Sequence, residues 1–356
     1  MKKTLYYILA LLFLSVVLNA CGGIKYLTIE TQEPAKVTLP NNIRSVLIVN
    51  NTTPQPDHIG HALKRLGKSE FEDVSASADS LAVYFTEALS QFLDEEEFFD
   101  DVLYYKHPLR NDSLFLEQVP IMPDEMNRLR NEAGADAIIS LDQLLFTTVR
   151  KQHFRQEGAI FADIVGKVQA ILRVYQPSME GEIPVIQYTD SVKWAGYDLE
   201  NAGTSYNFIF DEDILPSEKE AMKELAVRAA EKASNSLSPH WETQNRWLYT
   251  LQNKWMQDGM VYAERADWTN AIDKWTQFYN GQKNKLNKAK AANNIALAYE
   301  MQGDMTQAKE WVSAAYDLFS QSATPGSFDI RRIVLYKNEI ERRAGNENIL
   351  NGQIPR

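Results

Sequence analysis

The chain has 356 residues, of which 44% are hydrophobic and 24% charged, a composition typical of globular proteins and unlike that of disordered chains. Its formal net charge of −11 repels phosphate backbones, so the composition argues against nucleic acid as a partner. The length exceeds what one hydrophobic core usually serves, which predicts at least two domains.

The first 20 residues have the pattern of an export signal. Two lysines open the chain, and an apolar run of 14 residues follows from Leu5 to Leu18. A helix needs about 20 apolar residues to cross a bilayer, so this run predicts a signal peptide rather than a membrane span. The run ends in Leu18-Asn19-Ala20-Cys21, which resembles the lipobox of bacterial lipoproteins. We therefore expect residues 1–20 to be cleaved.

The lipobox resemblance implies that Cys21 carries a diacylglycerol and, after cleavage, an acyl chain such as palmitate on its amino group. Two or three acyl chains anchor a protein far more firmly than one. Cys21 is the only cysteine in the chain, which favours lipidation over an ordinary secreted protein with a chance cysteine. It also excludes a structural disulfide within the chain.

Residues 21–41 mix Gly, Thr, Glu and Pro, which predicts an extended, lipidated tether. Residues 42–238 then alternate strand and helix patterns. The expected elements are a strand at 44–50, a loop at 54–73, an amphipathic helix at 75–92, a strand at 102–105, a short helix at 123–133, strands at 135–149, 159–175 and 185–194, and a helix at 217–237. This order predicts an α+β domain whose helices pack on one face of a mixed sheet.

The order of elements, together with the strand entry Ala135-Asp-Ala-Ile-Ile139, resembles the small periplasmic domain of envelope lipoproteins. The families concerned are the penicillin-binding-protein activators and the curli secretion lipoprotein, and the N-terminal domain of the Tol–Pal translocation protein has the same layout. The resemblance covers residues 42–238 and rests on the layout and this one short motif.

The second half of the chain contains a repeat. After a predicted linker at 239–250, tyrosines 262, 299 and 336 recur at intervals of 37 residues, and alanines 271 and 308 share the interval. The spacing of large and small residues resembles the tetratricopeptide pattern and predicts helical repeats at 251–345, followed by a polar tail at 346–356. The alternative is a generic helical hairpin domain. We expect the following residues to pack the repeats: Trp255, Gly259, Tyr262, Ala271, Trp275, Ala296, Tyr299 and Ala308.

The first helix of each repeat is expected to line a concave groove for peptides. The candidate groove residues are Met256, Met260, Asn293, Leu297 and Glu300. Methionine side chains are flexible, so a groove lined by them can adapt to varied peptides. The alternative is that these positions pack against the N-terminal domain.

No local motif predicts a catalytic residue, a metal site or a cofactor. The string Asp57-His58-Ile-Gly-His61 also occurs in class I aminoacyl-tRNA synthetases, but the Lys-rich loop that accompanies it there is absent from this sequence. Two histidines fall short of the three or four ligands that zinc takes, so this segment is expected to be a solvated loop. The acidic residues between 94 and 101 lack the spacing of an EF-hand and are expected to form a solvated helix end.

Taken together, the lipobox, the Pro-His-Trp string at 239–241 and the repeats resemble the Tyr- and Trp-rich tetratricopeptide lipoproteins of Bacteroidota bacteria. In that phylum, acidic residues often follow the lipidated cysteine of surface-exposed lipoproteins. The segment Gly22-Gly23-Ile24-Lys25-Tyr26 lacks them, which favours the periplasmic leaflet of the outer membrane over the cell surface.

We expect a lipid-anchored, non-enzymatic scaffold that binds protein partners in the cell envelope. The alternative is a hydrolase, or a protein that binds a small ligand or glycan, with its site between the two domains. The expected partners are the membrane, through the lipid anchor, and envelope proteins. We expect no nucleic acid partner and no cofactor.

Overall fold

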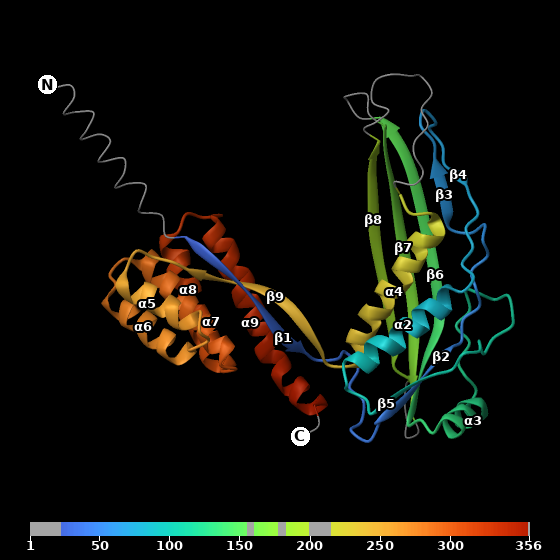
Figure 1. Ribbon diagram of the computed structural model, residues 1–356, viewed down its shortest axis with the longest axis horizontal. Coiled ribbons are helices and arrows are strands. Elements are labelled where there is room, and N and C mark those ends of the chain that lie inside the picture. The colour runs from blue at the N-terminus through green and yellow to red at the C-terminus, as the bar shows by residue number, and fades with distance from the viewer. Residues whose placement is uncertain (1–22, 155–159, 177–182, 199–214, 355–356) are drawn as a thin grey trace. The chain divides into compact units, whose positions relative to one another are not determined.

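The computed structural model describes residues 23–154, 160–176, 183–198 and 215–354 (Figure 1). The chain divides into two compact units, which we describe separately as the α/β unit and the helical unit. The α/β unit comprises Pro34–His240 and Gln353–Arg356, and the helical unit comprises Met1–Glu33 and Trp241–Gly352. The predicted signal peptide and Cys21 lie outside the described residues. Within the described ranges, no helix is both long and apolar enough to cross a membrane.

The α/β unit is built on a mixed sheet, as the sequence predicts. Strand β2 (Ser45–Asn50) lies parallel to β5 (Asp101–Tyr104) on one side and to the first part of β6 (Ala137–Phe154) on the other. Strands β7 (Ile160–Tyr175) and β8 (Val185–Asp198) continue the sheet antiparallel to β6. The three long strands β6, β7 and β8 run side by side in Figure 1.

The second half of β6 pairs with strands that the sequence does not reveal. Strand β3 (His61–Lys64) lies parallel to β6 from Thr148 onwards, and β4 (Glu72–Asp73) pairs antiparallel with β3. The prediction of a loop over 54–73 is therefore wrong for these residues. A strand of four residues is too short for a visible alternation of apolar and polar positions, and its pairing depends on the distant β6.

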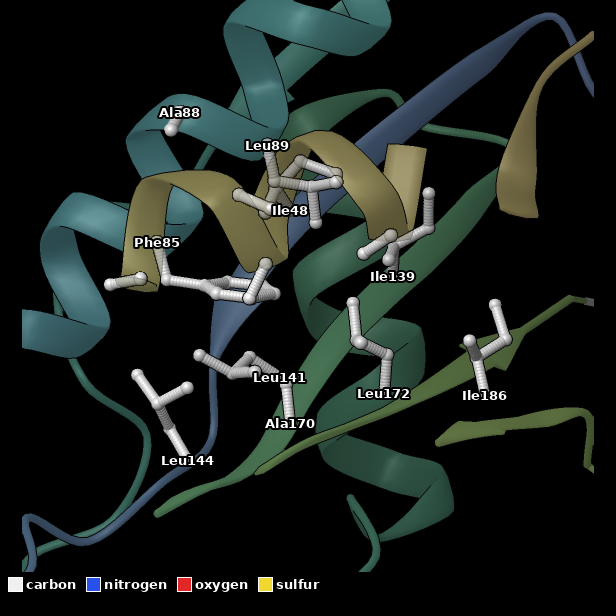
Figure 2. Packing of buried hydrophobic residues seen from close by; sticks show 14 of the residues in the cluster. Ile48, Phe85, Ala88, Leu89, Ile139, Leu141, Leu144, Ala170, Leu172 and Ile186 are labelled. Carbon is white, nitrogen blue, oxygen red and sulfur yellow. The ribbon is translucent and has the colours of Figure 1, made fainter. Parts of the chain in front are cut away.

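Two helices cover one face of the sheet. Helix α2 (Leu81–Glu95) and helix α4 (Glu218–Leu237) share a hydrophobic core with β2, β6 and β7. Figure 2 shows Phe85 and Leu89 of α2 packed near Ile48, Leu141 and other sheet residues. Helix α4 begins with a capping box between Ser217 and Glu220, which satisfies backbone donors at its first turn.

The third helix, α3 (Pro123–Ala133), packs on the opposite face, so the prediction that all helices lie on one face is wrong. Leu129 of α3 contacts Leu47 and Ile138, whereas the neighbouring residues of both strands belong to the core under α2 and α4. Side chains alternate between faces along a strand, and every residue of β2 is buried. A strand buried on both faces needs cover on both, and α3 supplies it here.

The helical unit contains five helices within the described residues. They are α5 (Lys254–Ala263), α6 (Trp268–Gly281), α7 (Lys285–Met301), α8 (Met305–Ser322) and α9 (Phe328–Gln353). The first four begin at Asn or Asp residues whose side chains accept a backbone N–H of the first turn. The predicted all-helical region is confirmed. The polar tail expected from 346 is wrong up to 353, because α9 continues through Gly345.

A two-stranded antiparallel ribbon completes the helical unit. It consists of β1 (Ile24–Glu33) and β9 (His240–Tyr249). The N–H of Thr250 donates to the carbonyl of Gly23 at 2.9 Å, and Thr28 bonds Asn245 at 3.3 Å. The sequence predicts a tether over 24–33 and a linker over 240–249. Both predictions are wrong, because these residues pair as strands. The pairing of β1 with β9 joins residues more than 200 positions apart, which local composition cannot reveal.

Candidate functional site

Helix α7 of the helical unit holds an extended segment of the chain itself, the end of β9. The Asn294 side chain accepts the Tyr249 N–H at 2.8 Å and donates to the Tyr249 carbonyl at 2.9 Å. The preceding residue, Asn293, donates to the carbonyl of Trp247 at 3.2 Å. Helix α7 thus holds the backbone of β9 by hydrogen bonds that do not depend on the side chains of the held segment.

A buried ion cluster fixes the side chains of the same segment. Arg246 of β9 donates to both oxygens of Glu300, with Nη2 to Oε1 at 2.8 Å and Nε to Oε2 at 3.0 Å. The Tyr336 hydroxyl donates to Glu300 Oε2 at 2.8 Å, and Arg343 forms a further ion pair with Glu300. Burial and the adjacent Glu300 carboxylate raise the pKa of Tyr336, so its phenol stays a neutral donor.

The predicted groove residues are therefore not an open peptide-binding surface. All five predicted residues are buried: Met256, Met260, Asn293, Leu297 and Glu300. Asn293 and Glu300 contact β9 of the same unit. Met256 and Met260 line a small cavity of about 280 Å³ with Gly23 and Thr250.

Most of the predicted repeat-packing residues lie in the core of the helical unit. Gly259 packs directly against the indole of Trp275, where an added Cβ would lie 2.3 Å from Nε1. Tyr262 and Tyr299 are half-buried, and the fully buried members are Ala271, Trp275, Ala296 and Ala308. Trp255 departs from the prediction, because 43% of its surface is exposed. It lies in the first turn of α5, next to the buried Met256.

Among the described residues, β8 is an edge strand of the sheet in the α/β unit. Strand β8 pairs with β7 over fourteen register positions, from Val185 to Asp198. Within the described ranges, no strand pairs with the other edge of β8. On the sheet face away from α2 and α4, a shallow hollow of about 510 Å³ crosses β6, β7 and β8, and exposed polar side chains such as Lys167, Thr189 and Ser191 line it.

A second cavity of about 400 Å³ lies where β2 ends, at the first turn of α2. Sheets with helices on both faces commonly bind ligands at the carboxyl ends of their parallel strands. The buried Arg110 of this cavity is bonded to Asp112 and to the carbonyls of Leu114 and Glu117. Its guanidinium therefore stabilises the loop in which it lies.

The prediction of a solvated loop over His58–His61 is wrong at His61, whereas His58 is exposed. His61 opens β3 and is only 2% exposed, with Nδ1 2.8 Å from Thr148 Oγ1. Burial lowers the pKa of His61, although the carboxylates of Glu218 and Asp57 act in the opposite direction. In the part of the chain that the structure describes, no three His, Cys, Asp or Glu residues cluster as a metal site would require.

The buried His61 predicts a pH dependence of stability. The unfolded chain binds a proton at His61 near pH 6.5, whereas the folded chain keeps the ring neutral to lower pH. Stability should therefore fall as the pH decreases below about 6.5, by up to about 1.4 kcal/mol per pH unit for this group. Urea unfolding between pH 7 and 5 should show a shallower decline in His61→Asn. The exposed His58→Asn should follow the unmodified chain, and an unchanged slope in His61→Asn would contradict the assignment.

Sequence reasoning missed the residues that hold β9, which are Asn294, Arg246 and Tyr336. Asn294 stands beside Asn293 in an otherwise Ala-rich helix, and two adjacent amides there are an unusual feature. The sequence predicts a linker at Arg246 and a groove position at Glu300. Their pairing depends on β9 packing against α7, and no local pattern indicates it.

Two family models match the chain. One, described as a domain of unknown function (DUF8603), covers residues 43–249, and another domain of unknown function (DUF6340) covers residues 257–342. No curated protein matches the chain. Among solved structures, the 1.65 Å structure of the hypothetical protein CT253 from Chlamydia trachomatis is 13% identical over 43% of this chain and 71% of its own, with a TM-score of 0.18. That likeness is too small to carry an argument about fold or function.

Proposed function

This chain belongs to the DUF8603 family, and we propose that it is a lipid-anchored scaffold that docks protein partners in the bacterial cell envelope. The anchor is Cys21, at the end of the lipobox-like string, and the proposed location is the periplasmic leaflet of the outer membrane. The proposed partners are envelope proteins, and the activity is binding rather than catalysis.

We also infer that helices α5 to α8 are two tetratricopeptide-like repeats. The close packing of Gly259 on Trp275 and the buried alanines at 271, 296 and 308 support this, because small residues let paired helices approach closely. The hydrogen bonds from Asn293 and Asn294 to the backbone of β9 support it further, since they hold an extended segment in the groove. Because β9 fills this groove, we infer that protein partners bind to another surface.

The open edge of β8 is the observation that carries the docking proposal. An edge strand presents unpaired backbone N–H and C=O groups, to which an extended partner segment can add as a further strand. The outward-facing side chains Gln187, Thr189 and Ser191 of β8 are exposed and polar. The partner segment we infer is therefore extended, with polar side chains on the face that lies over the hollow beside Lys167.

A photo-crosslinking amino acid placed at Gln187 in cells tests this proposal, beside one placed at the exposed Thr306 of α8. We expect the Gln187 probe to capture a defined envelope protein through one extended segment, and the Thr306 probe not to capture it. Lysine on an edge strand opposes the addition of another strand. The pair Thr189→Lys and Ser191→Lys should therefore cut the crosslink about tenfold, while Thr306→Lys leaves it unchanged. Equal capture at both positions, or no effect of the edge lysines, would overturn the proposal.

A further inference from the structure

Two of the most exposed aromatic side chains in the described residues lie together on the helical unit. Phe328 is 72% exposed and Tyr26 is 62% exposed. Arg332 connects them, because its Nη2 donates to the Tyr26 hydroxyl at 3.1 Å and its guanidinium carbon lies 5.8 Å from the centre of the Phe328 ring. Arg331 lies equally close to that ring. We call these four residues the aromatic–basic patch.

The patch lies at the end of the helical unit where the described chain begins. Tyr26 is the third residue of β1, and Gly23 just before this strand bonds Thr250 at the end of β9. The Tyr249 hydroxyl donates to Asp329 at 2.9 Å and so joins this end of β9 to the start of α9, where Phe328 lies. The patch and the start of the described chain are therefore at the same end of the unit.

The length of chain between Gly23 and Cys21 limits how far this end can lie from an anchoring membrane. The two positions differ by two residues, and an extended chain spans at most about 3.3–3.6 Å per residue. An acyl group on Cys21 would therefore hold Gly23 within about 7 Å of the lipid headgroups. Side chains as exposed as Tyr26 and Phe328 then reach the interface.

The chemistry of the patch suits this location. Aromatic side chains are enriched at the headgroup level of membranes, and arginines near the surface are attracted to anionic lipid phosphates. Two acidic groups lie nearby, Asp329 beside Arg332 and Glu264 in an ion pair with Lys25, and they offset part of the positive charge. Arg331 is exposed on the patch, in a chain whose overall charge is −11.

We propose that Tyr26, Phe328, Arg331 and Arg332 form a lipid-contacting surface that lies against the headgroups of the membrane carrying the anchor. This inference depends on the lipid anchor of the proposed function. Its occupant is an anionic phospholipid headgroup layer, and a partner protein on the same patch is the competing outcome. The contact would orient the helical unit on the membrane instead of leaving it to rotate about a lipidated terminus.

The single cysteine allows a direct test with the mature chain. Residues 21–356 are coupled through the Cys21 thiol to a maleimide lipid in vesicles of mixed phosphatidylcholine and phosphatidylglycerol, and compared with the same chain coupled to a soluble maleimide. Hydroxyl-radical footprinting measures the accessibility of Tyr26 and Phe328. We expect their labelling to fall about fivefold on vesicles, as an interaction of about 1 kcal/mol with the surface implies. Trp241, which is 60% exposed near the other end of the ribbon, should be labelled equally in both.

A matched pair of variants separates the patch from mere proximity to the vesicle. Phe328→Ser should restore most of the Tyr26 labelling, whereas Ile349→Ser, at an exposed position near the other end of α9, should not. Equal labelling of Tyr26 and Phe328 on and off vesicles would overturn the proposal, as would protection that requires an added protein. Because the coupling is chemical, either result is independent of acylation in cells. The proposed anchor itself fails only if the native N-terminal peptide carries no lipid.

Discussion

Replacing Glu300 by alanine is expected to lower the free energy of unfolding of the helical unit by about 3–5 kcal/mol, the range for removing one partner from a buried ion pair. The Glu300 side chain is 1% exposed and the Arg246 side chain 6%. Alanine would leave the guanidinium of Arg246 buried without its counter-ion and would also remove the acceptor of the Tyr336 hydroxyl. A cavity at the centre of the groove would add to the loss.

The helical unit provides its own reporter for this measurement, because six of the seven tryptophans lie between Trp241 and Trp311. Urea unfolding followed by tryptophan fluorescence should show the lower midpoint in Glu300→Ala. Glu300→Gln, which keeps the shape but not the charge, should fall between it and the unmodified chain. Glu347→Ala, at an exposed position of α9, should change stability by less than about 0.5 kcal/mol. A loss below about 1 kcal/mol in Glu300→Ala would mean that β9 is held by its backbone contacts alone.

The cluster around Glu300 also shows which contacts the sequence does not reveal. The repeat spacing predicts Asn293 and Glu300 as groove residues, and the structure buries both of them against β9. The pairing of Arg246 with Glu300 joins residues 54 positions apart, and the pairing of Glu33 with Arg342 joins residues 309 apart. Such contacts depend on the complete fold, since nothing near Arg246 in the sequence indicates its partner.

Local chemistry predicted other elements to within a few residues. Helix α3 begins at Pro123 and ends before Gly134, where the left-handed backbone at φ 69° favours glycine, and both residues are visible signals. Helix α4 likewise begins at its Ser217 capping box. The strand β1 has no such signal, because its Thr- and Glu-rich sequence resembles a spacer. Its buried Thr31 donates to the carbonyl of Glu242, which lies 211 residues further along the chain.

The same dependence on distant partners applies to the buried carboxylate of the α/β unit. Asp142 lies in the bulge of β6, between Leu141 and Gln143, and its side chain is 0% exposed. Ser140 donates to its Oδ1 at 2.6 Å, Asn51 donates to the same oxygen at 3.1 Å, and Arg173 of β7 forms an ion pair with Oδ2. Burial raises the pKa of Asp142, whereas the three donors act to lower it. The donors therefore stabilise the ionised form of the carboxyl group.

Asp142→Asn should therefore lower the stability of the α/β unit by about 3 kcal/mol, near the lower end for breaking a buried pair because Arg173 remains 14% exposed. The asparagine NH₂ group would face the donors of Arg173 or Asn51, whichever way the amide turns, so one of them loses its acceptor. Asp190→Asn is the matched control, since its pair with Arg228 lies at the surface and such pairs contribute about 0–1 kcal/mol. Hydrogen exchange of the β6 and β7 amides, which reports on this unit alone, measures both. Equal losses of stability in the two variants would contradict the prediction, because the buried pair of Asp142 would then contribute no more than the surface pair of Asp190.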